Sequence, residues 1–300
     1  MKTHIIRFLT VVPLTAMLGC DSVTPLAEQS PDTQPAQVSS AATAVSFEFD
    51  TTGIATPPSG GLPTQLLQAN AFTDAILQRG LIGTTEPFTV ASELGTRLEL
   101  ESASWKLERD GASGRALVLN KVESGPLTRQ EPDVLQRNSM ARLQRWGIPT
   151  TEVGEIRQVA SFLQSEDVGT FEPAELHRHK TFVLRAINGI RVQGHRAVVT
   201  HGVDGSFQRA LISWPALARE GHLLRTRLPT AEIQRKATEA LVAEGLTTGR
   251  VRLFWKYVPH RLTDGSWALT LQVGAAVASV TTETHTEEPR VIDVDVSAVP

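Results

Sequence analysis

The chain has 300 residues, with 29 lysines and arginines against 32 aspartates and glutamates, so its formal net charge at pH 7 is −3. This mild acidity argues against a nucleic-acid-binding protein and against a polybasic membrane-binding surface, because both need concentrated positive charge. A single cysteine excludes disulfides within these residues, so any core must be held by apolar burial alone.

The first 20 residues have the pattern of a secretory signal. Lys2 and Arg7 precede a short apolar run over residues 8–18, which is too short to span a bilayer of about 30 Å. A glycine and then Cys20 follow, and this ending resembles the signal of bacterial lipoproteins. The resemblance implies that Cys20 carries lipid such as palmitate and anchors the chain to an envelope membrane on its extracytoplasmic side. An ordinary signal peptide with a chance cysteine is the alternative.

The next segment, residues 21–46, is rich in Ser, Thr, Pro, Ala and Gln and has few large apolar side chains. Such a composition cannot bury enough surface to offset the entropy lost on ordering. We therefore expect a flexible tether that holds the folded part clear of the membrane.

An N-terminal unit is expected over residues 47–128, beginning with a strand near Phe47. Apolar residues at helical spacing between a capping threonine and a terminal glycine predict a helix over 64–80. Alternating apolar residues predict a hairpin with arms over 96–109 and 115–122, with an irregularity in the first arm.

A middle unit is expected over residues 129–222. The apolar spacing and a following glycine predict a helix over 131–146. The short segment 155–164 is rich in β-branched and aromatic residues, which favours a strand. Residues 180–214 then read as three antiparallel strands.

Two tight turns define this three-stranded segment. Asn188-Gly189 accepts the positive φ angles of a type I′ turn, whose twist matches the flanking strands. Asp204-Gly205 is expected to form a second turn of the same kind.

A C-terminal unit is expected over residues 223–300. It should contain a helix over 229–245, two strands over 250–258 and 266–278, and a last strand over 289–296 with one solvated face. The predicted fold class is therefore α+β, with two or three units of one helix packed on an antiparallel β-meander.

The segment Phe182–Phe207 resembles the propeptide module of fungalysin and thermolysin-type metalloproteases. The matching residues are Asn188, Gly189, Ile190, Val192, Gly194, Asp204 and Gly205. The unit that begins at Pro229 is similar to the PepSY domain of those proenzymes, so the resemblance covers roughly residues 130–280. No His-Glu-x-x-His sequence occurs, so the protease itself is absent. The resemblance implies a PepSY-like module that binds a protein, and often one that inhibits or chaperones a peptidase.

Candidate chemistry is sparse. His177 and His179 would share one face of a regular strand and are weak candidates for half of a zinc or copper site. No further ligands occur at a recognisable spacing, so neither a metal nor a cofactor is predicted. The chain has no Gly-x-Ser-x-Gly sequence and no glycine-rich phosphate loop, so no enzyme is predicted.

Trp255 and Tyr257 would share one face of their strand. If that face is exposed, the two aromatic residues are candidates for a partner-binding surface. Packing of the same face into a core is an equally weighted alternative.

The sequence thus predicts a non-catalytic envelope lipoprotein, bound to the membrane through lipid on Cys20. Its expected partner is a protein such as a peptidase, and no nucleic acid is expected. The first alternative is a structural or envelope-assembly lipoprotein. A metal-dependent hydrolase that uses His177 and His179 ranks below both.

Overall fold

A computed structural model describes residues 45–56, 58, 62–63, 65–66, 72–81, 85–122, 129–163, 166–167, 170–171, 174–217, 221–222, 228–263, 267–278 and 291–297. The predictions for the signal, for Cys20 and for most of the tether lie outside these residues. None of the helices in the described part of the chain has both the length and the hydropathy that a membrane span requires.

The helical elements are α1 (Asp74–Arg79), α2 (Pro132–Arg145), the 3-10 turn η1 (Thr150–Glu152) and α3 (Thr230–Ala243). The strands are β1 (Ser46–Gly53), β2 (Leu62–Pro63), β3 (Gln65–Leu66), β4 (Thr89–Leu94), β5 (Arg97–Glu101), β6 (Trp105–Asp110), β7 (Arg115–Asn120), β8 (Val153–Leu163), β9 (Glu166–Asp167), β10 (Thr170–Phe171), β11 (Glu175–Ile187), β12 (Ile190–Gly202), β13 (Phe207–Ser213), β14 (Gly221–His222), β15 (Thr248–Arg261), β16 (Trp267–Ala278) and β17 (Val291–Ser297).

The predicted fold class is wrong, because the described chain is mostly β and its strands form one large mixed sheet. Thirteen strands are hydrogen-bonded together along the order β17-β16-β15-β12-β13-β7-β6-β5-β4, with β11, β8, β1 and β3 attached beside this path. Two contacts are parallel: β1 with β15, and β12 with β15. The expected units are therefore not separate helix-on-meander modules. Strands of different units pair with one another, which gives hydrogen-bond partners to main-chain groups at edges that would otherwise be free.

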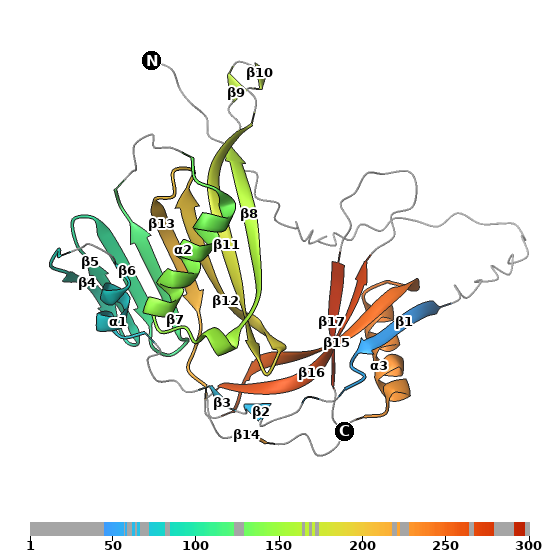
Figure 1. The fold of residues 1–300 in the computed structure, drawn as a ribbon. Helices are drawn as coiled ribbons and strands as arrows, with labels where there is room; N and C mark the ends of the chain where they lie inside the picture. Colours follow the sequence, from blue (N-terminus) through green and yellow to red (C-terminus); the bar gives the residue numbers. More distant parts are fainter. Residues whose placement is uncertain are drawn as a thin grey trace, which may run out of the picture.

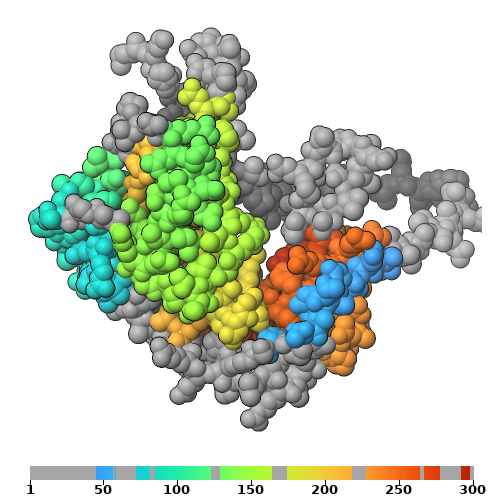
Figure 2. Space-filling view, in the orientation of Figure 1, coloured from blue at the N-terminus to red at the C-terminus, as the bar shows by residue number. Residues whose placement is uncertain are grey.

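The long hairpin of β11 and β12 joins the two lobes seen in Figure 1. The second half of β12 pairs with β13 in the first lobe, whereas Arg191 and Val192 near its start pair with β15 in the second. In Figure 2 the yellow tip of this hairpin reaches the orange and blue lobe. One hairpin thus contributes to both halves of the molecule.

Each lobe has its own hydrophobic core. In the first lobe, α2 covers one face of the sheet (Figure 1), and Leu143 and Trp146 pack with Val199 of β12. In the second lobe, the apolar stripe of α3 is fully buried together with Val192 and Leu253. The spacing of apolar residues along both helices is the reason that each one buries a single face.

The element predictions have mixed outcomes. The helices predicted over 131–146 and 229–245 are confirmed as α2 and α3, and the strand predicted over 155–164 is confirmed as β8. The helix predicted over 64–80 is wrong in extent. Among the described residues of that range, Gln65 and Leu66 form β3 and the helix α1 begins at Asp74, where Thr73 caps it by accepting a hydrogen bond from the Ile76 amide.

The predicted hairpin with arms over 96–109 and 115–122 is three strands, because the chain turns at residues 102–104 and separates β5 from β6. The first of the two predicted turns is confirmed, since Asn188 and Gly189 have φ angles of 51° and 77°. The second turn differs, because only Gly205 has a positive φ. There Asp204 Oδ1 accepts hydrogen bonds from the amide and hydroxyl of Ser206, which stabilises a longer loop.

Gly114, in the turn between β6 and β7, supports the pairing of β7 with β13. Its φ is +61°, and an added Cβ would lie 2.3 Å from the Cα of Pro215. Gly114→Ala is therefore expected to destabilise the fold by about 3 kcal/mol, from backbone strain plus a collision that backbone atoms cannot relieve. Gly95 has a φ of +59° but open space around it, so Gly95→Ala should cost only about 1 kcal/mol. If urea denaturation shows the same loss of unfolding free energy in both variants, the close approach of Gly114 to Pro215 is contradicted.

Candidate functional site

The sheet of the first lobe has one face covered by α2 and one open face. Strand register places Lys180, Thr200, Arg209 and Leu119 opposite one another in a row across β11, β12, β13 and β7. Residues opposite one another in neighbouring strands point to the same face. The neighbouring positions, such as Val199, are buried under α2, so this row lies on the open face.

A hollow of about 630 Å³ lies in the open face, and we call it the cationic hollow. Four basic side chains line it: Lys121, Arg178, Lys180 and Arg209. Its volume is within the usual range of small-molecule sites, about 300–1,000 Å³.

Two β-bulges shape this end of the sheet. The register of β11 with β8 shifts between Leu176 and Arg178, and the register of β12 with β13 shifts between Thr200 and His201. Bulges bend a strand and redirect its side chains, and they are common next to functional sites. Opposite Arg178 on β12 stands Gly202, and the side chains of Asp204, Ser206 and Gln208 approach this glycine closely.

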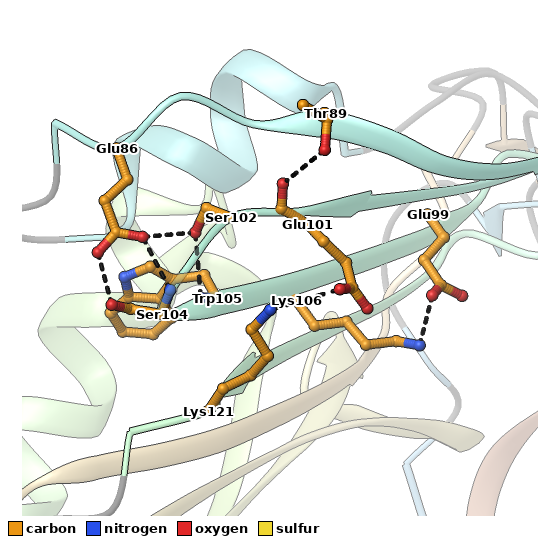
Figure 3. Close-up of polar contacts among 9 residues, drawn as sticks. All are labelled: Glu86, Thr89, Glu99, Glu101, Ser102, Ser104, Trp105, Lys106 and Lys121. Atoms are coloured by element: carbon orange, nitrogen blue, oxygen red, sulfur yellow. Dashed lines mark hydrogen bonds and ion pairs between the residues drawn. The ribbon is translucent and has the colours of Figure 1, made fainter.

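Toward β4 the charges on the open face are paired (Figure 3). Lys106 Nζ lies 2.6 Å from Glu99 Oε1, and Lys121 Nζ lies 3.4 Å from Glu101 Oε2. Thr89 also donates a hydrogen bond to the backbone carbonyl of Glu101. This part of the face is therefore close to neutral.

Hydrogen bonds to Glu86 connect the segment before β4 to the turn between β5 and β6 (Figure 3). Its carboxylate accepts hydrogen bonds from the Ser104 hydroxyl and amide and from the Ser102 hydroxyl, at 2.5 to 2.8 Å. These hydrogen bonds, that of the Ser104 hydroxyl first, lower the pKa of Glu86. The arrangement holds β4 in place and leaves no carboxylate oxygen free for chemistry.

The cationic hollow is different, because three of its basic side chains form no ion pair within the described part of the chain. Arg178, Lys180 and Arg209 are absent from every ion pair found there. Two atoms of the lining are buried without a hydrogen-bond partner among those residues, Arg178 Nε and Gln208 Oε1. Buried polar atoms normally have hydrogen-bond partners, so these two atoms indicate that a partner is missing from the hollow.

The predicted pair of histidines is split between the two faces. His177 lies at the bulge of β11 and lines the cationic hollow, where burial and the charge of Arg178 lower its pKa. His179 is paired with His201 on the face covered by α2 and is buried. The prediction that the two imidazoles share a face is wrong because the bulge breaks the alternation. The described residues contain no group of three or more His, Cys, Asp or Glu side chains that could hold a metal.

Beside His179 lies a buried polar cluster under α2. Ser139 Oγ is 3.5 Å from His201 Nδ1, but its hydroxyl also lies 2.8 Å from the Leu135 carbonyl, to which it donates a hydrogen bond. Burial, followed by the charge of Arg142, lowers the pKa of His201 to about 4. A serine that is fully buried and whose hydroxyl is already engaged is not placed to attack a substrate, so this cluster is structural.

Trp255 and Tyr257 lie in the core of the second lobe and not on a surface. Trp255 is 8% exposed and Tyr257 is fully buried. The indole of Trp255 donates a hydrogen bond to the carbonyl of Thr56, and burial raises the pKa of Tyr257 to about 12. Neither side chain therefore offers a surface to a partner.

The edge of the sheet beside the cationic hollow is formed by β8. Its end, Gln158–Leu163, has no charged residue and no proline. Val159 is 46% exposed and Phe162 is 61% exposed. Sequence reasoning identified this strand but missed its position at an edge. It also missed the hollow, although the alternating basic residues Arg178 and Lys180 are a visible signal.

Comparisons with known proteins place the chain in no family. No family model and no curated protein matches it. An uncharacterized protein from Eubacterium rectale is similar with a TM-score of 0.48 and 10% identity, over 79% of this chain and 82% of that one. The C-terminal domain of YpeB from Bacillus megaterium is similar with a TM-score of 0.39 and 8% identity, over 76% of this chain and 95% of that one. TM-scores below 0.5 at such low identity assign no function to this chain.

Proposed function

We propose that the chain is a non-catalytic envelope lipoprotein, tethered through lipid on Cys20, whose β8 edge binds an extended strand of a partner protein. The observation that carries this proposal is the uncharged end of β8, with its exposed valine and phenylalanine. The N-terminal signal pattern and the polar segment after it support the tether.

The end Gln158–Leu163 of the β8 edge lacks the charged residues and prolines by which proteins protect free edges. One side of β8 pairs with β11, and no other described strand pairs with its second side. Free edges are normally blunted by lysine, by proline or by a covering segment. The end Gln158–Leu163 has none of these residues, so an added strand would gain main-chain hydrogen bonds and bury Val159 and Phe162.

The other edges are better protected. Asp293 and Asp295 of β17 point away from the core and form ion pairs with Lys256. The strand β4 carries Glu93, and its register shifts between Val90 and Ser92. A charge and a bulge both oppose the addition of a further strand.

A peptidase is the partner that the resemblance to protease propeptides supports. Binding at an edge strand would then modulate the peptidase without any catalytic residue in this chain. The same edge also suits an envelope-assembly role, in which the partner is a structural component and proteolysis is unaffected.

The test places a photo-reactive amino acid at position 162 of the full chain in its native envelope. We expect a crosslink to one partner protein. With the photo-reactive amino acid moved to position 159, the same crosslink should form, and Phe162→Lys should abolish it. Val90→Lys is the matched control, since Val90 is also 61% exposed but lies on β4, and it should leave the crosslink intact. A crosslink only to a second copy of this chain, or none at all, would contradict the proposal.

The activity of the crosslinked partner distinguishes the two roles. If the partner is a peptidase, its turnover should change when the full chain is added and should not change with the Phe162→Lys variant. An unchanged turnover with both proteins would favour the assembly role.

A further inference from the structure

We infer that the cationic hollow is a binding site for a small anion that carries phosphate. This site is independent of the β8 edge and of any partner strand there. The inference rests on the charge of the hollow, on its unpartnered buried atoms and on its shape.

The charge of the hollow calls for an anion with more than one negative charge. Lys121 forms an ion pair with Glu101, whereas Arg178, Lys180 and Arg209 form no ion pair among the described residues. A single carboxylate would neutralise only one of them. A phosphate monoester carries a charge of about −1.5 to −2 at pH 7, and a diphosphate carries more, so phosphate groups match the hollow better.

The geometry lets several side chains reach one ligand. Lys180 and Arg209 stand on either side of Thr200, on strands two apart, so their Cα atoms are separated by about 10 Å. Arg178 is two residues from Lys180 on the same strand and lies opposite Gly202. The side chains of Asp204 and Gln208 lie beside that glycine. Long basic side chains on three strands therefore surround Thr200.

The buried atoms without partners specify the ligand further. Arg178 Nε is a donor, and guanidinium groups bind phosphate oxygens in a planar, paired geometry. Gln208 Oε1 is an acceptor, which a hydroxyl group on the ligand would satisfy. A phosphate ester of a hydroxylated molecule supplies both kinds of group.

Four basic side chains line the hollow, and the two carboxylates at this end of the sheet, Glu101 and Asp204, can offset only two of those charges. Glu101 is engaged by Lys121, and Oδ1 of Asp204 is engaged by the amide and hydroxyl of Ser206. Neither carboxylate lines the hollow. Phosphate could reach it as a free phosphate ester or as the headgroup of a membrane lipid, and the experiment separates these sources.

Calorimetry on the full chain in uncharged detergent micelles tests the inference. One arm titrates inorganic pyrophosphate, and the other titrates micelles that contain phosphatidic acid. Saturable binding in the first arm supports a free phosphate ester, and binding only in the second supports a lipid headgroup. No saturable binding in either arm would overturn the inference.

Arg178→Gln/Lys180→Gln is expected to weaken binding by about tenfold or more, because charge-assisted hydrogen bonds are lost. The matched control is Arg137→Gln/Arg145→Gln, which removes the same charge from two exposed positions on α2. It should leave the affinity unchanged. Equal weakening in both double variants would show a general charge effect and would also overturn the inference.

A second variant keeps the test valid if the first one does not fold. Lys121→Gln/Arg209→Gln changes two exposed residues of the hollow and should also weaken binding about tenfold. The crosslink at Phe162 should survive in each hollow variant. Loss of anion binding is therefore distinguishable from failure of the β8 proposal.

Discussion

Replacing Glu152 with alanine is expected to destabilise the protein by about 3–5 kcal/mol, because it leaves the buried guanidinium of Arg185 without its counter-charge. Glu152 Oε2 accepts hydrogen bonds from Nε and one terminal nitrogen of Arg185, at 2.9 and 2.6 Å, and from the indole of Trp214 at 2.9 Å. The Arg185 side chain is only 2% exposed. Urea denaturation at neutral pH measures the loss.

The surroundings of Arg185 explain the size of this effect. Burial lowers the pKa of Arg185 and Glu152 opposes that shift, so the carboxylate stabilises the buried charge. The guanidinium also donates to the carbonyl of Pro215 at 2.6 Å and lies over the ring of Trp214. The network joins η1, β11 and the segment after β13, so its loss should loosen three elements at once.

Two variants check the cause. Glu155→Ala removes an exposed ion pair with Arg157 on the neighbouring strand β8 and should cost less than about 1 kcal/mol. Glu152→Ala combined with Arg185→Met removes the stranded charge and should be more stable than Glu152→Ala alone. If the double variant is less stable than the single one, packing of Arg185 and not its charge dominates.

Stability is expected to fall as the pH drops from about 6.5 to 4, since two buried histidines are neutral in the fold. Burial, then the charge of Arg142, lowers the pKa of His201 to about 4, and burial, then Arg185, lowers the pKa of His195 to about 3. An unfolded histidine titrates near 6.5. Below about pH 6.5 the unfolded chain therefore binds protons that the folded chain does not bind. The stabilising contribution of the two neutral histidines is complete only above that pH.

The groups around His201 are Ser139 and Arg142 from α2, His179 from β11 and Asp204 from the following turn, and only Asp204 favours the protonated ring. The contribution of His201 amounts to about 3 kcal/mol lost by pH 4. The slope of the unfolding free energy against pH is proportional to the number of protons taken up on unfolding, and His201→Gln should reduce that number by about one in this range. The exposed His260→Gln is the control, and an identical slope in both variants would contradict the assignment.

Elements that depend on local spacing were predicted well. Both long helices follow from apolar residues at helical spacing, as Ile233, Ala237 and Leu241, each four positions apart, show in α3. The turn at Asn188 follows from the tolerance of asparagine and glycine for positive φ.

Properties that depend on strand partners were not predictable. The sequence places Trp255 and Tyr257 on one face of a strand, but only the packing of α3 makes that face the core. The pairing of β1 with β15 joins Ser46 to Thr248, and no local pattern connects residues so far apart. The cationic hollow needs side chains from β7, β11 and β13, together with a bulge that separates His177 from His179.

The sequence by itself determined the two long helices, most strand positions and the Asn188 turn, because each depends on the conformational preferences of neighbouring residues. Only the tertiary structure decided which strands pair, which faces are buried and where basic side chains meet. Those outcomes depend on hydrogen bonds and apolar contacts between distant segments, since any strand of suitable length offers the same main-chain groups to many partners.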